Sequence, residues 1–213
     1  TRYPVELVMA IRYLVSLMLI LTFFWPVTGR TLWQTKHTRW VHLRGLILVL
    51  ASPMIDHALR LIPVGETISI LYSFPILVMI LSIPLMKEKL NLFNWGCAVF
   101  GFAGVLIILR PGGGLDTLGV TFALPTALLT AIFNLMTKVL SQTETSHALL
   151  FHSILVGTLC SCLLALYTWE GYFPNLMDSG LIALLGIVLT SAHFLLTVAY
   201  RYAPASLIAP ANW

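Results

Sequence analysis

Long apolar runs recur along almost the whole chain, and they restrict the folds that it can adopt. Most runs are about 17–22 residues long, enough at 1.5 Å of rise per residue for a helix to cross a hydrocarbon core of about 30 Å. They lack the alternation of apolar and polar residues that marks a barrel strand, so we expect helices. The predicted spans are 4–25, 43–59, 65–86, 92–109, 119–139, 147–168 and 180–199, with an eighth beginning near residue 205.

Composition argues against a soluble alternative. The chain is 59% hydrophobic and 9% charged, whereas soluble domains are about 25% charged. A soluble helical core of this size would need polar outer faces on most of its helices, and the sequence lacks these faces. We therefore predict an all-α membrane protein.

A short pattern occurs twice in the chain. Residues 58–63 read Ala-Leu-Arg-Leu-Ile-Pro, and residues 199–204 read Ala-Tyr-Arg-Tyr-Ala-Pro, an offset of 141 (199 minus 58). Both copies follow one apolar run and precede another, and we call them the first and second hinge. Five predicted spans separate the hinges, so they are expected on opposite sides of the membrane. This pattern predicts an inverted repeat of five-helix bundles, as in secondary transporters, with a binding site between the halves.

The repeat also predicts where the chain is incomplete. Residues 1–112 would form the first repeat without its first helix, and residues 113–213 the second repeat without its C-terminal helices. The chain is then a fragment with about seven full transmembrane helices and part of an eighth. We expect such a fragment by itself not to transport, because alternating access requires both repeats around one site.

Basic residues predict the orientation in the membrane. The segments expected on one side carry eight of the twelve Lys and Arg residues, namely Arg30, Lys36, Arg39, Arg44, Lys87, Lys89, Lys138 and Arg201. The positive-inside rule then places the 26–44 connection in the cytoplasm of a multi-pass protein of the cell membrane, the inner membrane if the source is bacterial. This asymmetry explains the net charge of +4, which is therefore no evidence for nucleic-acid binding.

No motif in the sequence predicts a cofactor, a metal or a catalytic centre. Cys97, Cys160 and Cys162 lie inside apolar runs, without the spacing or partner ligands of a zinc site. The sequence contains neither a Gly-x-Ser-x-Gly elbow nor a His-Glu-x-x-His motif. We therefore expect neither a metal nor a cofactor, and no enzyme activity.

Polar side chains inside the apolar runs are the candidates for a solute cavity, because such groups usually face a bundle interior, a partner helix or a water-filled path. Three stripes lie on single helical faces of 65–86, 119–139 and 180–199. Their members are Ser69, Tyr72 and Ser73; Thr126, Thr130, Asn134 and Thr137; and Thr190, His193, Thr197 and Tyr200. Pro75 follows the first stripe and is expected to kink its helix.

The offset of 141 also pairs polar residues of the two halves, Ser52 with His193 and Asp56 with Thr197. A symmetric site would produce this coincidence. The structural alternatives stay open, because hydroxyls can bond back to their own helix, His193 can exchange protons or link two helices, and Asp56 can form an ion pair with Arg60. The predicted cavity residues are Ser52, Asp56, Ser69, Tyr72, Ser73, Thr130, Asn134, His193, Thr197, Asn212 and Trp213.

Several motifs, taken in order, resemble a known family. They are Pro4-Val5-Glu6 with Arg12, the first hinge with Glu66 and Pro75, Lys87-Glu88-Lys89-Leu90, Trp95, Gly101-x-x-Gly104-Val105 before Arg110-Pro111-Gly112, and His193 to Ser206. Together they resemble the EamA-type ten-helix members of the drug/metabolite transporter superfamily, over essentially the whole chain. The resemblance implies two inverted five-helix repeats and alternating access to a central cavity, for varied small metabolites.

The leading functional prediction is a transporter that exports or exchanges small organic solutes, with protons as one candidate driving ion. An intramembrane enzyme and a non-transporting receptor or scaffold are the alternatives. Besides the solute and the lipid bilayer, a second copy of the chain is a candidate partner. The small residues of the 92–109 span could form its contact or could pack a helix of the same copy, and they are Gly96, Gly101, Ala103 and Gly104.

Overall fold

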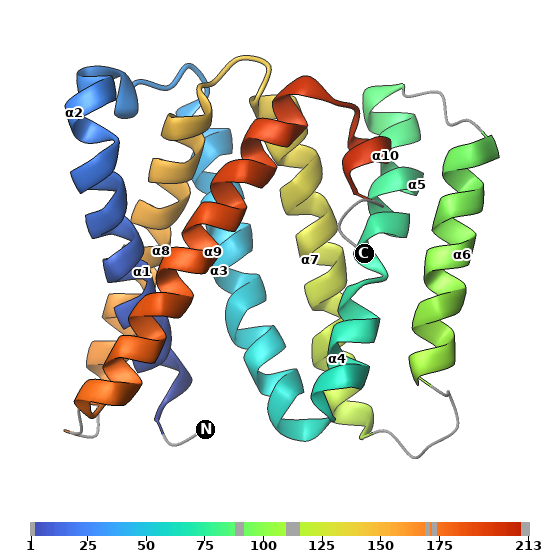
Figure 1. Cartoon of the computed structure of the whole chain (residues 1–213), viewed down its shortest axis with the longest axis horizontal. Coiled ribbons are helices and arrows are strands. Elements are labelled where there is room, and N and C mark those ends of the chain that lie inside the picture. The colour runs from blue at the N-terminus through green and yellow to red at the C-terminus, as the bar shows by residue number, and fades with distance from the viewer. Residues whose placement is uncertain (1–2, 88–91, 110–115, 169–170, 172–173, 210–213) are drawn as a thin grey trace. The chain divides into compact units, whose positions relative to one another are not determined.

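The computed structural model describes residues 3–87, 92–109, 116–168, 171 and 174–209 (Figure 1). Within these residues, all regular secondary structure is helical. Five helical segments are long and apolar enough to cross a membrane, namely Val5–Phe23, Val64–Met86, Thr117–Leu140, Ser146–Thr168 and Leu176–Tyr202. The prediction of an all-α membrane protein is confirmed.

The helices follow the predicted runs closely. In chain order they are α1 (Val5–Phe23), α2 (Trp25–Thr28), the 3-10 helix η1 (Gly29–Leu32), α3 (Thr38–Leu61), α4 (Val64–Leu71), α5 (Phe74–Met86), α6 (Leu92–Leu109), α7 (Thr117–Leu140), α8 (Ser146–Thr168), α9 (Leu176–Tyr202) and α10 (Ala205–Ile208). The predicted spans 43–59 and 92–109 coincide with α3 and α6, which are not among the five apolar segments. Their crossing of the membrane stays a prediction.

The chain packs into two compact units. Unit 1 comprises residues 1–49 and 139–201, and unit 2 comprises residues 50–138 and 202–213. Helix α3 contributes its first half to unit 1 and its second half to unit 2. These units are defined by packing, whereas the repeats 1–112 and 113–213 are defined by internal likeness of the sequence. The division into repeats therefore stays a prediction.

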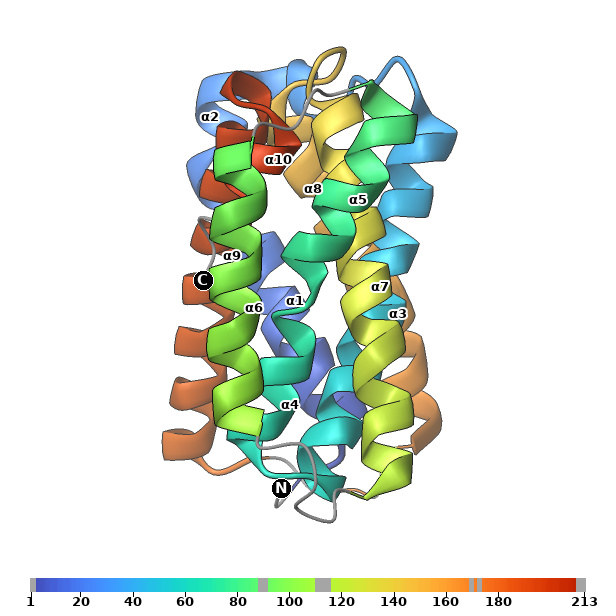
Figure 2. The same cartoon turned by 90° about the vertical axis from the view of Figure 1, so that its right-hand side faces the viewer.

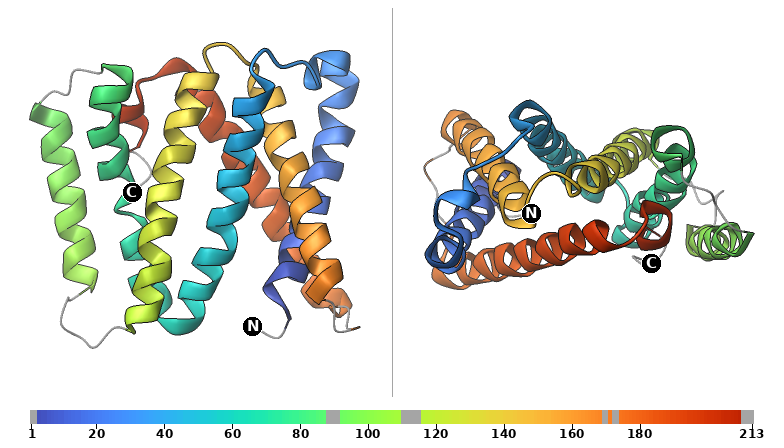
Figure 3. Two further views of the ribbon diagram at one scale, coloured as in Figure 1. Left: turned by 180° about the vertical axis from the view of Figure 1, so that it is seen from behind. Right: turned by 90° about the horizontal axis from the view of Figure 1, so that it is seen from above.

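In unit 1, α1 packs against both α8 and α9 through small residues (Figure 3). A Cβ added to Gly157 would lie 2.4 Å from the Tyr13 ring, and one added to Gly186 would lie 2.9 Å from the carbonyl oxygen of Arg12. The hydroxyl of Thr190 donates to Ser16 Oγ at 2.7 Å, which links α9 to α1. Close backbone approach and interhelical hydrogen bonds are the usual means of packing helices in lipid.

Arg44 corrects one detail of the predicted topology. The sequence assigned it to the 26–44 loop, but α3 begins at Thr38 and the Arg44 side chain is only 1% exposed. Its Nη1 donates to the carbonyl oxygen of Leu149 at 3.0 Å and to Ser153 Oγ at 2.6 Å. The guanidinium group therefore belongs to the interior of unit 1, where α8 supplies acceptors that no local pattern in the sequence reveals.

In unit 2, the first hinge and the last residues of the second hinge (202–204) lie at opposite ends of α7. Near its start, a Cβ added to Gly119 would lie 2.6 Å from Ile62 Cγ2, so the first hinge packs there. Near its end, Lys138 Nζ donates to the carbonyl oxygen of Ala203 in the second hinge at 2.8 Å. Gly119 and Lys138 are 19 residues apart (138 minus 119), about 29 Å along a helix. This distance is close to the thickness of a hydrocarbon core.

Candidate functional site

The apolar span Val64–Met86 is interrupted near its middle. Helix α4 ends at Leu71, α5 begins at Phe74, and Tyr72 and Ser73 form a turn between them (Figure 2). Pro75 explains the break, because it has no N–H group and its ring clashes with the carbonyl four residues earlier. The structure therefore confirms the predicted disturbance and makes it a complete interruption. Interrupted membrane helices are common at transporter binding sites, because they leave backbone polar groups available to a solute.

Helix α7 runs beside this interruption within unit 2 (Figures 1 and 2). Two members of its predicted polar stripe are occupied by their own helix, since Thr126 Oγ1 donates to the carbonyl oxygen of Phe122 at 2.8 Å and Thr137 Oγ1 to that of Phe133 at 2.6 Å. For these two residues the structural alternative holds. The hydroxyl of Thr130 has no hydrogen-bond partner among the described residues, so it is available to a solute.

Asn134 is the most unusual member of the stripe. Its side chain is 2% exposed, and its Oδ1 atom accepts no hydrogen bond from any residue in the described part of the chain. An unsatisfied buried acceptor costs about 1–3 kcal/mol, so most proteins avoid one unless water or a ligand completes it. Asn134 is therefore the strongest single candidate for a solute-binding group.

The remaining predicted residues of unit 2 differ in how much they are buried. Ser69 is buried and donates to the carbonyl oxygen of Gly65 at 2.7 Å, whereas Ser52 and Asp56 are half-buried on α3. Sequence reasoning missed Glu66, whose Oε2 atom is buried without a hydrogen-bond partner among the described residues. The available signal was a carboxylate in the first turn of an apolar span, directly after the first hinge.

The two candidates on α9 belong to unit 1. Thr197 is buried, donates to the carbonyl oxygen of His193 at 2.7 Å and accepts from Arg44 Nη2 at 3.4 Å. Its hydroxyl therefore helps to hold Arg44, while His193 is half-buried. Asn212 and Trp213, the last predicted cavity residues, lie outside the described residues. That the α9 residues join those of unit 2 around one solute stays a prediction.

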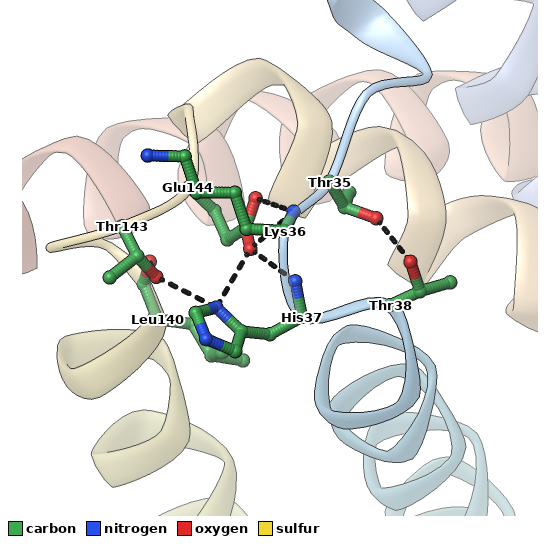
Figure 4. Close-up of polar contacts among 7 residues, drawn as sticks. All are labelled: Thr35, Lys36, His37, Thr38, Leu140, Thr143 and Glu144. Carbon is green, nitrogen blue, oxygen red and sulfur yellow. Dashed lines mark hydrogen bonds and ion pairs between the residues drawn. The ribbon is translucent and has the colours of Figure 1, made fainter.

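A polar cluster joins the loop before α3 to the turn after α7 at one end of unit 1 (Figure 4), and Arg201 links a third segment to it. The buried carboxylate of Glu144, in the turn between α7 and α8, accepts hydrogen bonds from the backbone N–H groups of Lys36 at 2.9 Å and His37 at 2.8 Å. Arg201 Nη1 donates to the carbonyl oxygen of Glu144 at 3.4 Å. The 26–44 connection, the turn after Lys138 and the second hinge thus meet, as expected for segments predicted to share one side of the membrane.

Replacing Glu144 with Gln should lower the free energy of unfolding by about 1–3 kcal/mol. The carboxylate accepts from two backbone N–H groups ahead of α3, whereas an amide offers one oxygen and turns N–H donors toward the others. Thermal unfolding of the purified protein measures the change. Glu6→Gln is the matched control, because Glu6 accepts no hydrogen bond from a described residue. Equal melting temperatures for the two variants would contradict the role assigned to Glu144.

Comparisons with known proteins agree with this architecture. Residues 1–110 match the EamA-like transporter family. The riboflavin transporter of Vibrio cholerae is 26% identical over 209 residues, which cover 97% of this chain and 70% of that protein. The S-adenosylmethionine uptake transporter of Rickettsia bellii is 26% identical over 168 residues, 79% of this chain and 57% of that protein. The chain thus spans little more than half the length of the second relative.

A solved structure supports the fold independently of close sequence similarity. One crystal structure matches the chain with a TM-score of 0.81 at 18% identity, over 98% of this chain and 74% of the other. At this identity the likeness concerns the fold alone. Together with the family match over more than half of the sequence, it confirms the resemblance seen in the motifs. The chain belongs to the EamA-like transporter family.

Proposed function

We propose that the protein moves a small organic metabolite with a nitrogen-containing ring across the membrane by alternating access, without converting it chemically. Riboflavin and S-adenosylmethionine, named for its relatives, are both metabolites of this kind. The ring nitrogens and amide edges of such compounds donate and accept hydrogen bonds in one plane. A side-chain amide matches this pattern, since it offers a donor and an acceptor side by side.

The open acceptor of Asn134 is the observation that carries this proposal. It lies in a candidate membrane span of unit 2 that runs beside the break between α4 and α5. The hydroxyls of Ser73 and Thr130 also have no hydrogen-bond partner in the described ranges. A polar solute that enters unit 2 would find these groups without competing bonds and the Asn134 acceptor already buried, which favours binding.

Flux of labelled solute into lipid vesicles tests the proposal. Vesicles that contain the protein purified from its whole gene should take up or exchange riboflavin or S-adenosylmethionine faster than protein-free vesicles, whereas residues 1–213 by themselves are expected to be inactive. The sequence predicted export or exchange, whereas the Rickettsia relative is named for uptake, so flux is measured in both directions. Solute binding without flux would favour the receptor alternative, and a chemically altered solute would favour the enzyme alternative.

We also propose that the two hinges face opposite sides of the membrane, with the 26–44 connection in the cytoplasm. Their attachment to opposite ends of α7, a candidate membrane span, supports this arrangement and with it the inverted repeat.

We also propose a homodimer through α6, since a Cβ added to Gly96 or Gly104 would meet nothing within 4 Å. Disulfide cross-linking of Gly96→Cys between copies tests the dimer.

Cysteine labelling should place the hinges on different sides. Gly65→Cys lies two residues beyond the first hinge, where a Cβ meets nothing within 4 Å, and Tyr202→Cys lies in the second, where the side chain is 80% exposed. In a background without the native cysteines, an impermeant maleimide should label Gly65→Cys in intact cells. Tyr202→Cys should react only after permeabilisation. Reaction of both sites from the same side would exclude the inverted arrangement.

A further inference from the structure

Two histidines form a hydrogen-bonded chain inside unit 1. His42 Nε2 lies 3.2 Å from His152 Nδ1, and His152 Nε2 lies 3.2 Å from the carbonyl oxygen of Trp33. His152 is buried on α8, whereas His42 is half-buried near the start of α3. The solute site proposed in unit 2 uses neither residue.

The carbonyl oxygen of Trp33 determines which atom donates in each of these two hydrogen bonds. A carbonyl can only accept, so His152 Nε2 carries a hydrogen and donates it. In the neutral ring, His152 Nδ1 is then an acceptor, and His42 Nε2 must donate to it. The remaining acceptor of the pair is His42 Nδ1, which has no hydrogen-bond partner among the described residues.

We propose that His42 and His152 form a binding site for one proton, and that this proton is the ion coupled to solute movement. A proton from water adds to His42 Nδ1 and makes that ring an imidazolium. Its Nε2–H still donates to His152 Nδ1, and the hydrogen bond becomes charge-assisted and stronger. A second proton would have to bind His152 Nδ1. Two N–H donors on two positively charged rings would then face each other across 3.2 Å. The pair therefore holds one proton and repels a second.

Charged and titratable groups lie on each segment near the pair. Glu144 is the carboxylate in the turn before α8. Arg44, two residues beyond His42 on α3, donates to Leu149 and Ser153 on α8. His37 bonds Glu144 from the loop before α3. His147 lies on α8 five residues before His152. Arg201 on α9 donates to the Glu144 backbone, and Arg12 lies on α1, which also packs on α8.

The position of the pair explains how a bound proton would act on transport. The pair joins α3 to α8, and α3 continues from unit 1 into unit 2, where the solute-binding candidates lie. A stronger bond between His42 and His152 holds the first half of α3 against α8, so the protonated state favours one arrangement of these helices over another. This coupling step rests on the proposed transport function, whereas the proton site itself does not.

The proton site is tested by NMR of protein labelled with 15N-histidine, titrated from about pH 8 to pH 5. The ring nitrogens of His42 and His152 should change together, in one step that takes up one proton. His42→Gln is the decisive variant, because its amide N–H can still donate to His152 Nδ1 but cannot accept a proton. It should abolish the step at His152. His57→Gln, on the exposed part of α3, should leave it unchanged. Independent titration of the two rings would overturn the proposal.

Coupling is tested in vesicles with an imposed pH gradient. Wild-type protein and His57→Gln should show faster solute flux with the gradient than without it. His42→Gln should keep flux at equal pH and lose at least nine-tenths of the acceleration. Full acceleration in His42→Gln would overturn the coupling role. Absence of any flux in the wild type would instead refute the proposed function, and the NMR titration would still decide whether the proton site exists.

Discussion

Replacing Asn134 with Leu should lower solute flux about 10–100-fold and leave the protein at least as stable as the wild type. The two side chains have the same number of heavy atoms and the same branching, so packing changes little. Leu removes an acceptor that is buried without a partner, which relieves up to about 1–3 kcal/mol of desolvation cost. The solute loses a hydrogen bond in a dry site. The expected 10–100-fold fall corresponds to a loss of about 1.4–2.8 kcal/mol of binding free energy.

Flux at low solute concentration and thermal unfolding measure the two effects of Asn134→Leu. Thr126→Val is the matched control on the same helical face, because the Thr126 hydroxyl already donates to its own helix. It should transport like the wild type. Normal flux together with a lower melting temperature for Asn134→Leu would show that Asn134 serves packing, and the solute site would then have to lie elsewhere.

Replacing Gly186 with Val should lower the melting temperature by about 6–12 °C. An added Cβ would lie 2.9 Å from the backbone oxygen of Arg12, which cannot move without displacing α1 from α9. Overpacking of this kind costs on the order of 3 kcal/mol when backbone must shift, and each kcal/mol corresponds to about 2–4 °C in a chain of this size. Separation of the helices would also break the hydrogen bond between Ser16 and Thr190.

Gly180 provides the control for this effect. It lies on the same helix, and a Cβ added there meets nothing within 4 Å. Gly180→Ala should therefore be neutral or stabilising by up to about 1 kcal/mol, because Ala is the better helix former, whereas Gly186→Ala should destabilise. The same change in both variants would mean that α1 and α9 do not approach as closely as described.

Much of the fold could be predicted because its causes are local in the sequence. An apolar run of sufficient length must become a helix in lipid, since no other single segment satisfies its own backbone. Pro75 interrupts its helix wherever that helix packs. The self-bonded hydroxyls of Thr126 and Thr137 are equally local, since the carbonyl acceptor lies four residues away on the same helix.

The candidate site could be predicted only in part. The helical period correctly placed Thr130 and Asn134 on one face of α7, but four hydroxyl and amide groups on that face looked alike in the sequence. Burial and hydrogen bonding distinguish these four groups, and both properties depend on neighbouring helices. The same limitation hid Glu66, which the sequence analysis did not include among the cavity residues although one of its oxygens is buried.

The sequence alone determined that this chain is helical, membrane-embedded and related to EamA-type transporters, because hydrophobic length and motif order are properties of the chain itself. Only the tertiary structure decided the partners of Arg44, Glu144 and the His42–His152 pair. These partners are about 105–110 residues away along the chain. Such contacts arise when helices already formed pack against one another, and the pattern of a single segment does not specify which polar groups then meet.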